Sequence, residues 1–303
     1  MIKNYIESSI PDKDKDIELP MRIYMHSPDE KEMEEISKKS GISATLLKLA
    51  LDQNALSRIH QNHITYAIFD IPVVYGGIKH QRVKTYPVGL YFREGVFIAV
   101  SHASFPIVGE IMEDPEMKDV TNEELFLNMV FSIAKIYMRQ LNHIDRETEI
   151  LEDQMRRRVK NTAIFQLMEY QRSLTAMTTA LRGLRRMLAK IKEKNYCMDN
   201  SEILDDAIVA TEQASEMAEV FNDDLNALMD GFGSVISNSV NQIMKILTLL
   251  TLILSIPMVI AGLYGMNVRL PLATDFNAFW YICGISTLIA IVTTIWFYMK
   301  KML

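Results

Sequence analysis

The 303-residue chain has only two cysteines, Cys197 and Cys283, which are too few for a disulfide framework and do not resemble a metal cluster. Its first twenty residues lack the apolar core of a signal peptide, so we expect the part that follows to stay in the cytoplasm. The N-terminal part contains no GxGxxG, no P-loop, no Ser/His/Asp spacing and no His/Cys ligand pair. These absences argue against an enzyme.

Charge is missing from two long stretches near the C-terminus. From Ile246 to Tyr264 there are 19 uncharged residues, close to the ~20 that an α-helix needs to cross a bilayer. A second uncharged run, from Phe276 to Met299, follows after 11 residues. The two runs predict a transmembrane hairpin, with a first span at about 243–264, an outer loop at 265–275 and a second span at about 276–299.

The charges that flank the spans predict the orientation. Lys245 lies at the start of the first span, and Lys300 and Lys301 follow the second. The only charged residues in the loop between the spans are Arg269 and Asp275. The positive-inside rule then places both termini in the cytoplasm, so the predicted location is the cytoplasmic (inner or plasma) membrane, crossed twice.

Proline is absent between Thr121 and Val240, and glycine occurs there only at positions 183, 231 and 233. Leu, Met, Ile and Ala recur in this region at three- and four-residue spacing, which is typical of long helices. We expect three, at about 122–158, 162–194 and 200–264, the last continuing through Pro257 into the membrane. A helix of that length, on the order of 95 Å, is a stalk that needs partners to bury its apolar side.

Before Thr121 the pattern is mixed, and the fold class predicted here is an α/β or α+β domain. Residues 1–20 form a polar start, and segments rich in β-branched and aromatic residues follow between Gly-containing turns. The expected strands are Arg22–Met25, Ile64–Val74, Arg82–Phe92 and Val96–Ser101, and the expected helices are Asp29–Ser40, Ala44–Asp52 and Phe105–Asp114. The predicted domains are therefore a cytoplasmic α/β domain at 1–120, a long-helix region and coiled-coil-like stalk at 121–240, and a transmembrane hairpin at 241–303.

Opposite charges are sorted between the last two long helices. Residues 199–240 carry ten acids and no Lys or Arg, whereas residues 154–195 carry eleven bases and two acids. Charge pairing between adjacent antiparallel helices is one explanation, and a concentration of cations at the mouth of a pore is another. A net charge of −6 and the lack of aromatic stacking positions argue against nucleic acid as a partner.

One stripe of the first span is polar or small. On a helical wheel it gathers six residues: Asn241, Met244, Thr248, Thr251, Ser255 and Gly262. Such a stripe serves either packing or the lining of a pore, and two spans alone cannot enclose a pore. Conduction therefore requires an oligomer with the stripe on a central axis, where Met244 and Leu247 would form an apolar constriction. At the other end of the span, Gly265, Met266 and Asn267 offer helix-end carbonyls and an amide to a hydrated cation.

The first span also carries a family signature. Its start has the pattern NxxMKxLT from Asn241, and its end has AGxYGMN up to Asn267. Placed before a second span, this signature resembles the CorA family of divalent-cation transporters. The resemblance implies a homopentameric, funnel-shaped assembly whose first span lines the pore.

The resemblance also implies roles for individual residues. The outer selectivity ring would be Gly265, Met266 and Asn267, and matching pore-lining positions are Asn241, Met244, Leu247 and Thr248, with Thr251 and Ser255 further along the stripe. Lys300 and Lys301 match a basic ring at the inner mouth. A stalk aspartate that binds regulatory Mg²⁺ between subunits falls on Asp206, beside Asp205. Its usual acidic partner in the N-terminal domain has no clear match, and Asp70 is a guess.

The predicted function is a Mg²⁺ transporter or channel that is gated by cytoplasmic Mg²⁺ and driven by the electrochemical gradient, with no organic cofactor. The predicted partners are further copies of the chain, divalent cations and the lipid bilayer. A Co²⁺, Ni²⁺ or Zn²⁺ transporter on the same scaffold is the first alternative, although the retained Met266 favours Mg²⁺. A two-span membrane sensor or scaffold is the second. Arg269 stands where many family members have acids, and it opposes cation accumulation at the outer mouth.

Overall fold

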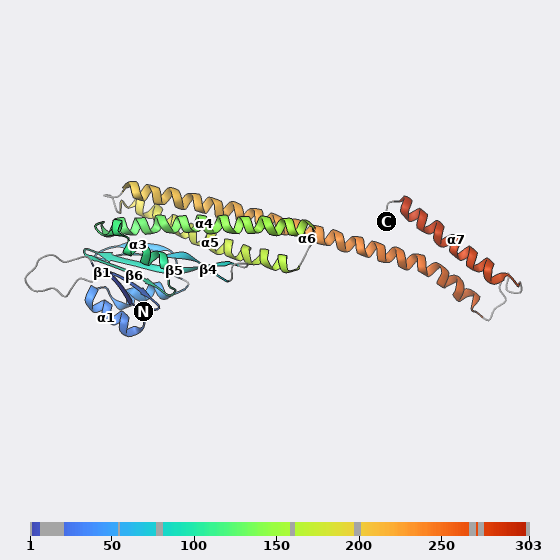
Figure 1. Ribbon diagram of the computed structural model, residues 1–303, viewed down its shortest axis with the longest axis horizontal. Coiled ribbons are helices and arrows are strands. Elements are labelled where there is room, and N and C mark those ends of the chain that lie inside the picture. The colour runs from blue at the N-terminus through green and yellow to red at the C-terminus, as the bar shows by residue number, and fades with distance from the viewer. Residues whose placement is uncertain are drawn as a thin grey trace, which may run out of the picture. The chain divides into compact units, whose positions relative to one another are not determined.

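The computed structural model describes residues 2–6, 21–53, 55–76, 81–157, 161–196, 201–266, 271 and 276–300. The chain divides into two compact units, residues 1–229 and 230–303. The first unit contains a sheet and its covering helices, and the second contains the end of a long helix and one further helix (Figure 1). Each unit is considered by itself.

The first unit is built on a six-stranded mixed sheet. Its strand order is β1-β2-β6-β5-β4-β3, in which β2 and β6 run parallel and the other neighbours are antiparallel. Strands β4 and β5 are the longest because both carry extended runs of β-branched and aromatic residues. The strands are β1 Ile2–Ile6, β2 Met21–His26, β3 Arg58–Gln61, β4 Thr65–Tyr75, β5 Arg82–Arg93 and β6 Val96–Ser101.

Helices cover both faces of this sheet, with α1 on one side and α4 on the other (Figure 1). On the first side, Met33 and Ile36 of α1 are buried in one cluster with Met25 and Tyr91 of the sheet. On the other side, Phe126 of α4 packs against the Phe92 ring, with the ring centroids 5.5 Å apart. The short helices of this unit are α1 Glu30–Ser40, α2 Ala44–Lys48, the 3₁₀ turn η1 Leu49–Leu51, α3 Pro106–Glu113 and the 3₁₀ turn η2 Pro115–Met117.

The long helices are confirmed close to their predicted bounds: α4 is Asn122–Arg157, α5 is Asn161–Glu193, α6 is Ser201–Tyr264 and α7 is Ala278–Met299. The helix α6 contributes residues to both units, and Pro257 lies inside it without ending it. Helices α4, α5 and α6 form because apolar residues recur in them at helical spacing and helix breakers are scarce.

A buried arginine fixes the segment that leads into α4. Arg22 of β2 has no exposed surface, and its guanidinium donates to the carbonyl oxygens of Met117, Lys118 and Val120. Burial lowers the pKa of Arg22, and the nearby Asp119 opposes that shift. Three carbonyls held by one side chain determine where the chain turns into α4.

Two strands were not predicted, and one helix was predicted too long. Strand β1 lies within the segment that the sequence presents as a polar start, and β3 is a four-residue strand with one buried apolar residue, Ile59. Both pair at an edge of the sheet, where strand formation depends on the neighbouring strand more than on local sequence. The expected helix at 44–52 is instead α2 followed by η1, because the chain tightens to 3₁₀ geometry at Leu49.

Candidate functional site

Within the part of the chain that the structure describes, α6 and α7 are long and apolar enough to cross a membrane. Only 6% of the spanning window of each is buried inside the chain. Leu250, Leu254 and Met258 are 53%, 59% and 73% exposed. The core helix of a soluble protein is covered by its own chain, so these surfaces require lipid or other copies of the chain to cover them.

The hydroxyl groups on the spanning part of α6 share one hydrogen-bonding pattern. Thr248 donates to the Met244 carbonyl at 2.8 Å, and Thr251 donates to the Leu247 carbonyl at 2.8 Å. Ser255 donates to the Leu252 carbonyl, also at 2.8 Å. Each hydroxyl hydrogen is therefore used inside the helix, and the oxygen is left as an acceptor. A row of acceptors without free donors suits a cation or its water shell.

The predicted pore-lining residues all lie on this one helix. Asn241, Met244, Leu247, Thr248 and Thr251 are exposed in the single chain, and Ser255 is half-buried. Proline has no N–H, so Pro257 leaves the Ile253 carbonyl without its usual helical donor, close to Ser255. The stripe is thus rich in oxygen over its middle section.

One hydrogen bond joins the residues on either side of the predicted filter. The Tyr264 hydroxyl donates to the Pro271 carbonyl at 3.2 Å, which joins the end of α6 to a residue further along the following loop. Gly265 and Met266 continue the helix end by donating to the carbonyls of Ala261 at 2.9 Å and Leu263 at 3.3 Å. Three further residues that the sequence analysis singled out, Asn267, Arg269 and Asp275, lie outside the described residues.

Glycine leaves open space on the outer part of the first span. A methyl group added at Gly262 would meet no atom within 4 Å in the single chain. The surface at this turn is therefore free to receive the backbone of another helix. At the far end of α7, Lys300 is exposed, and the second predicted member of the basic ring, Lys301, lies outside the described residues.

The two aspartates predicted to bind regulatory metal lie side by side in sequence near the start of α6, and both are exposed. Asp205 accepts a hydrogen bond from Lys192 of α5, with Nζ and Oδ1 2.8 Å apart. The hydrogen bond to Asp205 raises the pKa of Lys192. Beside this pair is a cavity of about 620 Å³ that is also lined by Glu193, Glu212 and Arg185. An ammonium therefore occupies part of the place where a divalent cation was expected.

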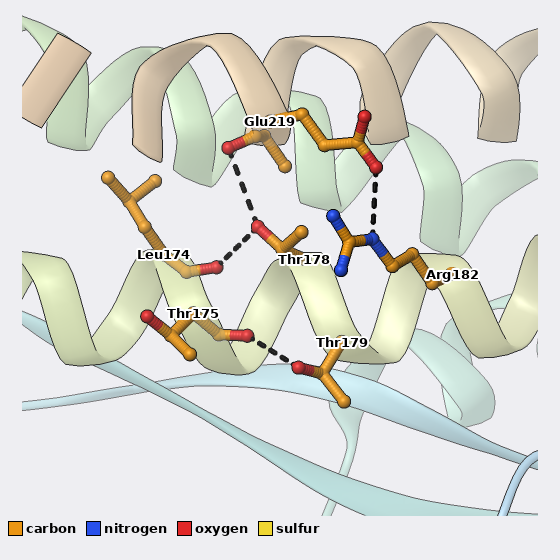
Figure 2. Close-up of polar contacts among 7 residues, drawn as sticks. Leu174, Thr175, Thr178, Thr179, Arg182 and Glu219 are labelled. Atoms are coloured by element: carbon orange, nitrogen blue, oxygen red, sulfur yellow. Dashed lines mark hydrogen bonds and ion pairs between the residues drawn. The ribbon is translucent and has the colours of Figure 1, made fainter. Parts of the chain in front are cut away.

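Further contacts join α5 to α6 along their length. Figure 2 shows Arg182 donating to Glu219 at 3.0 Å, and Thr178 donating to the carbonyls of Leu174 at 2.8 Å and Ala218 at 3.4 Å. Charge pairing between the basic and acidic helices is thus confirmed for two of the α6 acids, Asp205 and Glu219. The other acids of α6 make no ion pair with the described residues.

No group of three or more His, Cys, Asp or Glu side chains placed to hold a metal occurs among the described residues. Asp70 lies on β4 and lines a separate cavity beneath α5. Burial raises its pKa to about 6. Sequence reasoning did not find the Lys192 pair, the Tyr264 hydrogen bond or this cavity. Only the Lys192 pair had a signal in the sequence, namely the opposite charges of the two helices.

Comparison with known proteins agrees with this architecture. The sequence model of the family described as CorA-like Mg²⁺ transporter protein matches residues 23–301. The cobalt/magnesium transport protein CorA of Methanocaldococcus jannaschii is 25% identical over 277 residues, which cover 88% of this chain and 86% of that protein. The cobalt/magnesium transport protein CorA of Thermotoga maritima is 25% identical over 183 residues, covering 59% of this chain and 52% of that protein.

The fold is similar as well. The complete structure of the CorA magnesium transporter from M. jannaschii matches with a TM-score of 0.79 and 24% identity, covering 97% of this chain and 93% of that one. The family match extends over nearly the whole sequence, including both membrane helices. The chain is therefore a membrane protein and not an enzyme, and it belongs to the CorA-like Mg²⁺ transporter family.

Proposed function

We propose that the chain assembles into a homopentameric channel that conducts Mg²⁺ down its electrochemical gradient, with the polar stripe of α6 facing the central axis. The hydroxyl pattern of that stripe carries the proposal. Thr248, Thr251 and Ser255 use their hydrogens within the helix and offer only oxygen outward. Such a surface suits a hydrated cation, and its place on the helix that carries Asn241 at one end and the predicted filter at the other distinguishes it from the similar hydroxyls of α7.

The need for an assembly follows from the number of spans. Two helices cannot enclose an aqueous path, and the spanning surfaces of α6 and α7 are exposed in the single chain. Copies of α6 around one axis would bury the open surface at Gly262 and place Met244 and Leu247 in a ring. That apolar ring would close the path by dewetting. The number of copies, five, is taken from the resemblance to the family.

Ion selection is assigned to the outer end of the same helix. Gly265, Met266 and Asn267 would form a ring of carbonyls and amides that binds Mg²⁺ through its waters, since Mg²⁺ gives up its hydration shell reluctantly. A membrane potential of ~100 mV supplies ~4.6 kcal/mol for a divalent ion, which is sufficient without ATP. Both termini would lie in the cytoplasm, where Lys300 and Lys301 form the inner basic ring.

Regulation is assigned to Asp206 and Asp205 on α6, which would bind cytoplasmic Mg²⁺ and thereby reduce conduction. Co²⁺ is a second candidate substrate, because both curated relatives are named as cobalt/magnesium transport proteins. Competition among Mg²⁺, Co²⁺, Ni²⁺ and Zn²⁺ for flux through the purified protein would rank the ions. A two-span sensor would instead form a dimer without flux, so stoichiometry and flux together separate it from the channel.

The central test is Mg²⁺ uptake into vesicles that contain the purified protein and a Mg²⁺-sensitive dye. Asn267→Ala is expected to abolish uptake while the oligomer and its unfolding temperature stay as in the wild type. Asn277→Ala, in the turn that leads into α7, is the matched control and is expected to keep uptake. Normal uptake by the Asn267→Ala protein would overturn the filter assignment.

A further inference from the structure

The first two turns of α5 carry large apolar side chains on their outer surface. Phe165 is 65% exposed and Met168, one turn later, is 37% exposed, whereas the adjacent Leu167 is buried. Residues three apart on a helix share a face, so Phe165 and Met168 form one apolar surface. Among the described residues of the first unit, Phe165 is the only exposed phenylalanine. Grouped apolar side chains of this size indicate a surface that meets an apolar medium.

The sheet does not cover these turns of α5. Arg82, the first residue of β5, donates to the Glu169 carboxylate at 2.9 Å. The backbone N–H of the next residue, Val83, donates to the Ser173 hydroxyl at 3.1 Å. The part of α5 before Glu169 therefore extends past the end of β5, as Figure 1 shows. Phe165 and Met168 lie in this extension.

The pairing of α5 with α6 shows to which end of the first unit the extension belongs. Three contacts join the two helices: Lys192–Asp205, Arg182–Glu219 and Gln171–Asn226. Residue numbers fall along α5 as they rise along α6, so the two helices are antiparallel. The start of α5 is therefore at the end of the unit where α6 leaves it and continues into the membrane span.

The same part of the chain is basic. Residues 154–168 contain four bases, at positions 156, 157, 158 and 160, and no acid. Arg156 is exposed and pairs with Glu152, one turn earlier in α4, at 2.7 Å. An exposed pair of this kind is weak, and a guanidinium binds a phosphate group with two parallel hydrogen bonds. The nearest acids that oppose an anionic partner are Glu149 and Asp153, both exposed on α4.

We propose that the hairpin of α4 and α5 docks on the cytoplasmic headgroup layer of the bilayer, and that the lipids it prefers are anionic. Phe165 and Met168 enter the boundary between headgroups and acyl chains, and Arg156 binds lipid phosphate. Aromatic and apolar residues beside Lys and Arg are the combination that lies in the interface of a bilayer. Anionic lipids attract bases only within about one Debye length of the surface, so docking depends on salt.

The experiment measures how close the hairpin is to lipid in the full-length protein. A fluorophore is attached at Thr162→Cys, an exposed position one turn before Phe165, in a Cys197→Ser, Cys283→Ser background. The protein is placed in nanodiscs that contain a lipid with a nitroxide on its headgroup. We expect quenching to be about twofold stronger with phosphatidylglycerol present than with phosphatidylcholine alone, and to weaken at high salt. The matched control is a label at Thr179→Cys, an exposed position in the middle of α5, which should not be quenched.

Substitutions then test the residues that the proposal names. Phe165→Ser and Arg156→Gln, both at exposed positions, should each reduce quenching of the label at position 162 while the unfolding temperature stays unchanged. Asp153→Asn removes an opposing charge nearby and should leave quenching equal or slightly stronger. Asn267→Ala should also leave it unchanged, because docking does not involve the proposed filter.

Two results would overturn the proposal. One is equal quenching of the labels at positions 162 and 179 in nanodiscs with anionic lipid. The other is oxidative cross-linking of Thr162→Cys between subunits together with quenching that ignores lipid charge, which would show that a second copy of the chain covers Phe165.

Discussion

The Tyr264 hydroxyl donates a hydrogen bond to the Pro271 carbonyl at 3.2 Å, which joins the last residue of α6 to the chain seven residues later. All six residues between them, from Gly265 to Leu270, belong to or follow the predicted selectivity motif. A single contact therefore closes the segment in which ion selection is proposed. The net contribution of such a hydrogen bond to stability is about 0.5–1.5 kcal/mol.

Replacing Tyr264 by Phe removes this contact and keeps the ring. We expect Mg²⁺ uptake to fall by about twofold to tenfold, because the loop would spend less time in the conducting arrangement. Vesicle uptake assays measure the change. Tyr281→Phe, at an exposed tyrosine of α7, is the control and should leave uptake unaltered. Equal uptake by the Tyr264→Phe and wild-type proteins would show that the contact has no part in conduction.

The hydroxyl stripe has a matched control on the other span. Thr248→Val and Thr251→Val each remove one acceptor from the proposed path and are expected to lower Mg²⁺ flux roughly tenfold. Thr293 and Thr294 of α7 donate to helix carbonyls at 2.8 Å in the same way. Their valine variants should conduct normally, since α7 does not line the proposed path. Equal losses from both helices would point to packing as the role of the hydroxyls.

The Lys192–Asp205 ion pair predicts a change in regulation. If Asp205 and Asp206 bind inhibitory Mg²⁺, the Lys192 ammonium competes with that ion for Asp205. Lys192→Met should therefore shift inhibition to about twofold lower Mg²⁺, as expected for loss of an exposed pair. Arg182→Met, which breaks the equivalent pair with Glu219, is the control. Asp206→Ala should raise flux at millimolar internal Mg²⁺, and an unchanged inhibition curve would place the sensor elsewhere.

The half-buried Asp70 predicts how stability depends on pH. Its pKa is raised from 3.8 to about 6, so the fold favours the protonated carboxyl. The stabilising contribution is complete below the unfolded pKa and is lost as pH rises through about 6. At pH 7.5 and low divalent cation, Asp70→Asn should therefore be more stable than the wild type, by on the order of 2 kcal/mol.

Thermal unfolding at pH 5 and pH 7.5 measures this difference, with Asp153→Asn as the control. The difference in unfolding temperature between the wild type and Asp70→Asn should be larger at pH 7.5 than at pH 5. A difference that does not change with pH would mean that Asp70 is paired in solution.

Local sequence patterns were sufficient to predict much of the architecture. The near absence of helix breakers between 122 and 264 predicts the long helices, and uncharged runs of sufficient length predict the two spans. Both signals are one-dimensional, since they depend on periodicity, length and composition. The edge strands β1 and β3 lack such a signal and form because a neighbouring strand offers its hydrogen bonds.

The candidate sites likewise divide into those that follow from local sequence and those that depend on tertiary contacts. The stripe of α6 follows from residues on one helix, so the sequence alone determines that Thr248, Thr251 and Ser255 share a face. The Lys192–Asp205 contact joins two different helices, and the cavity at Asp70 is lined by residues that are far apart in the sequence, such as Asp70 and Thr179. Only the tertiary structure decided those contacts, because many pairings satisfy the same charges and only packing selects among them.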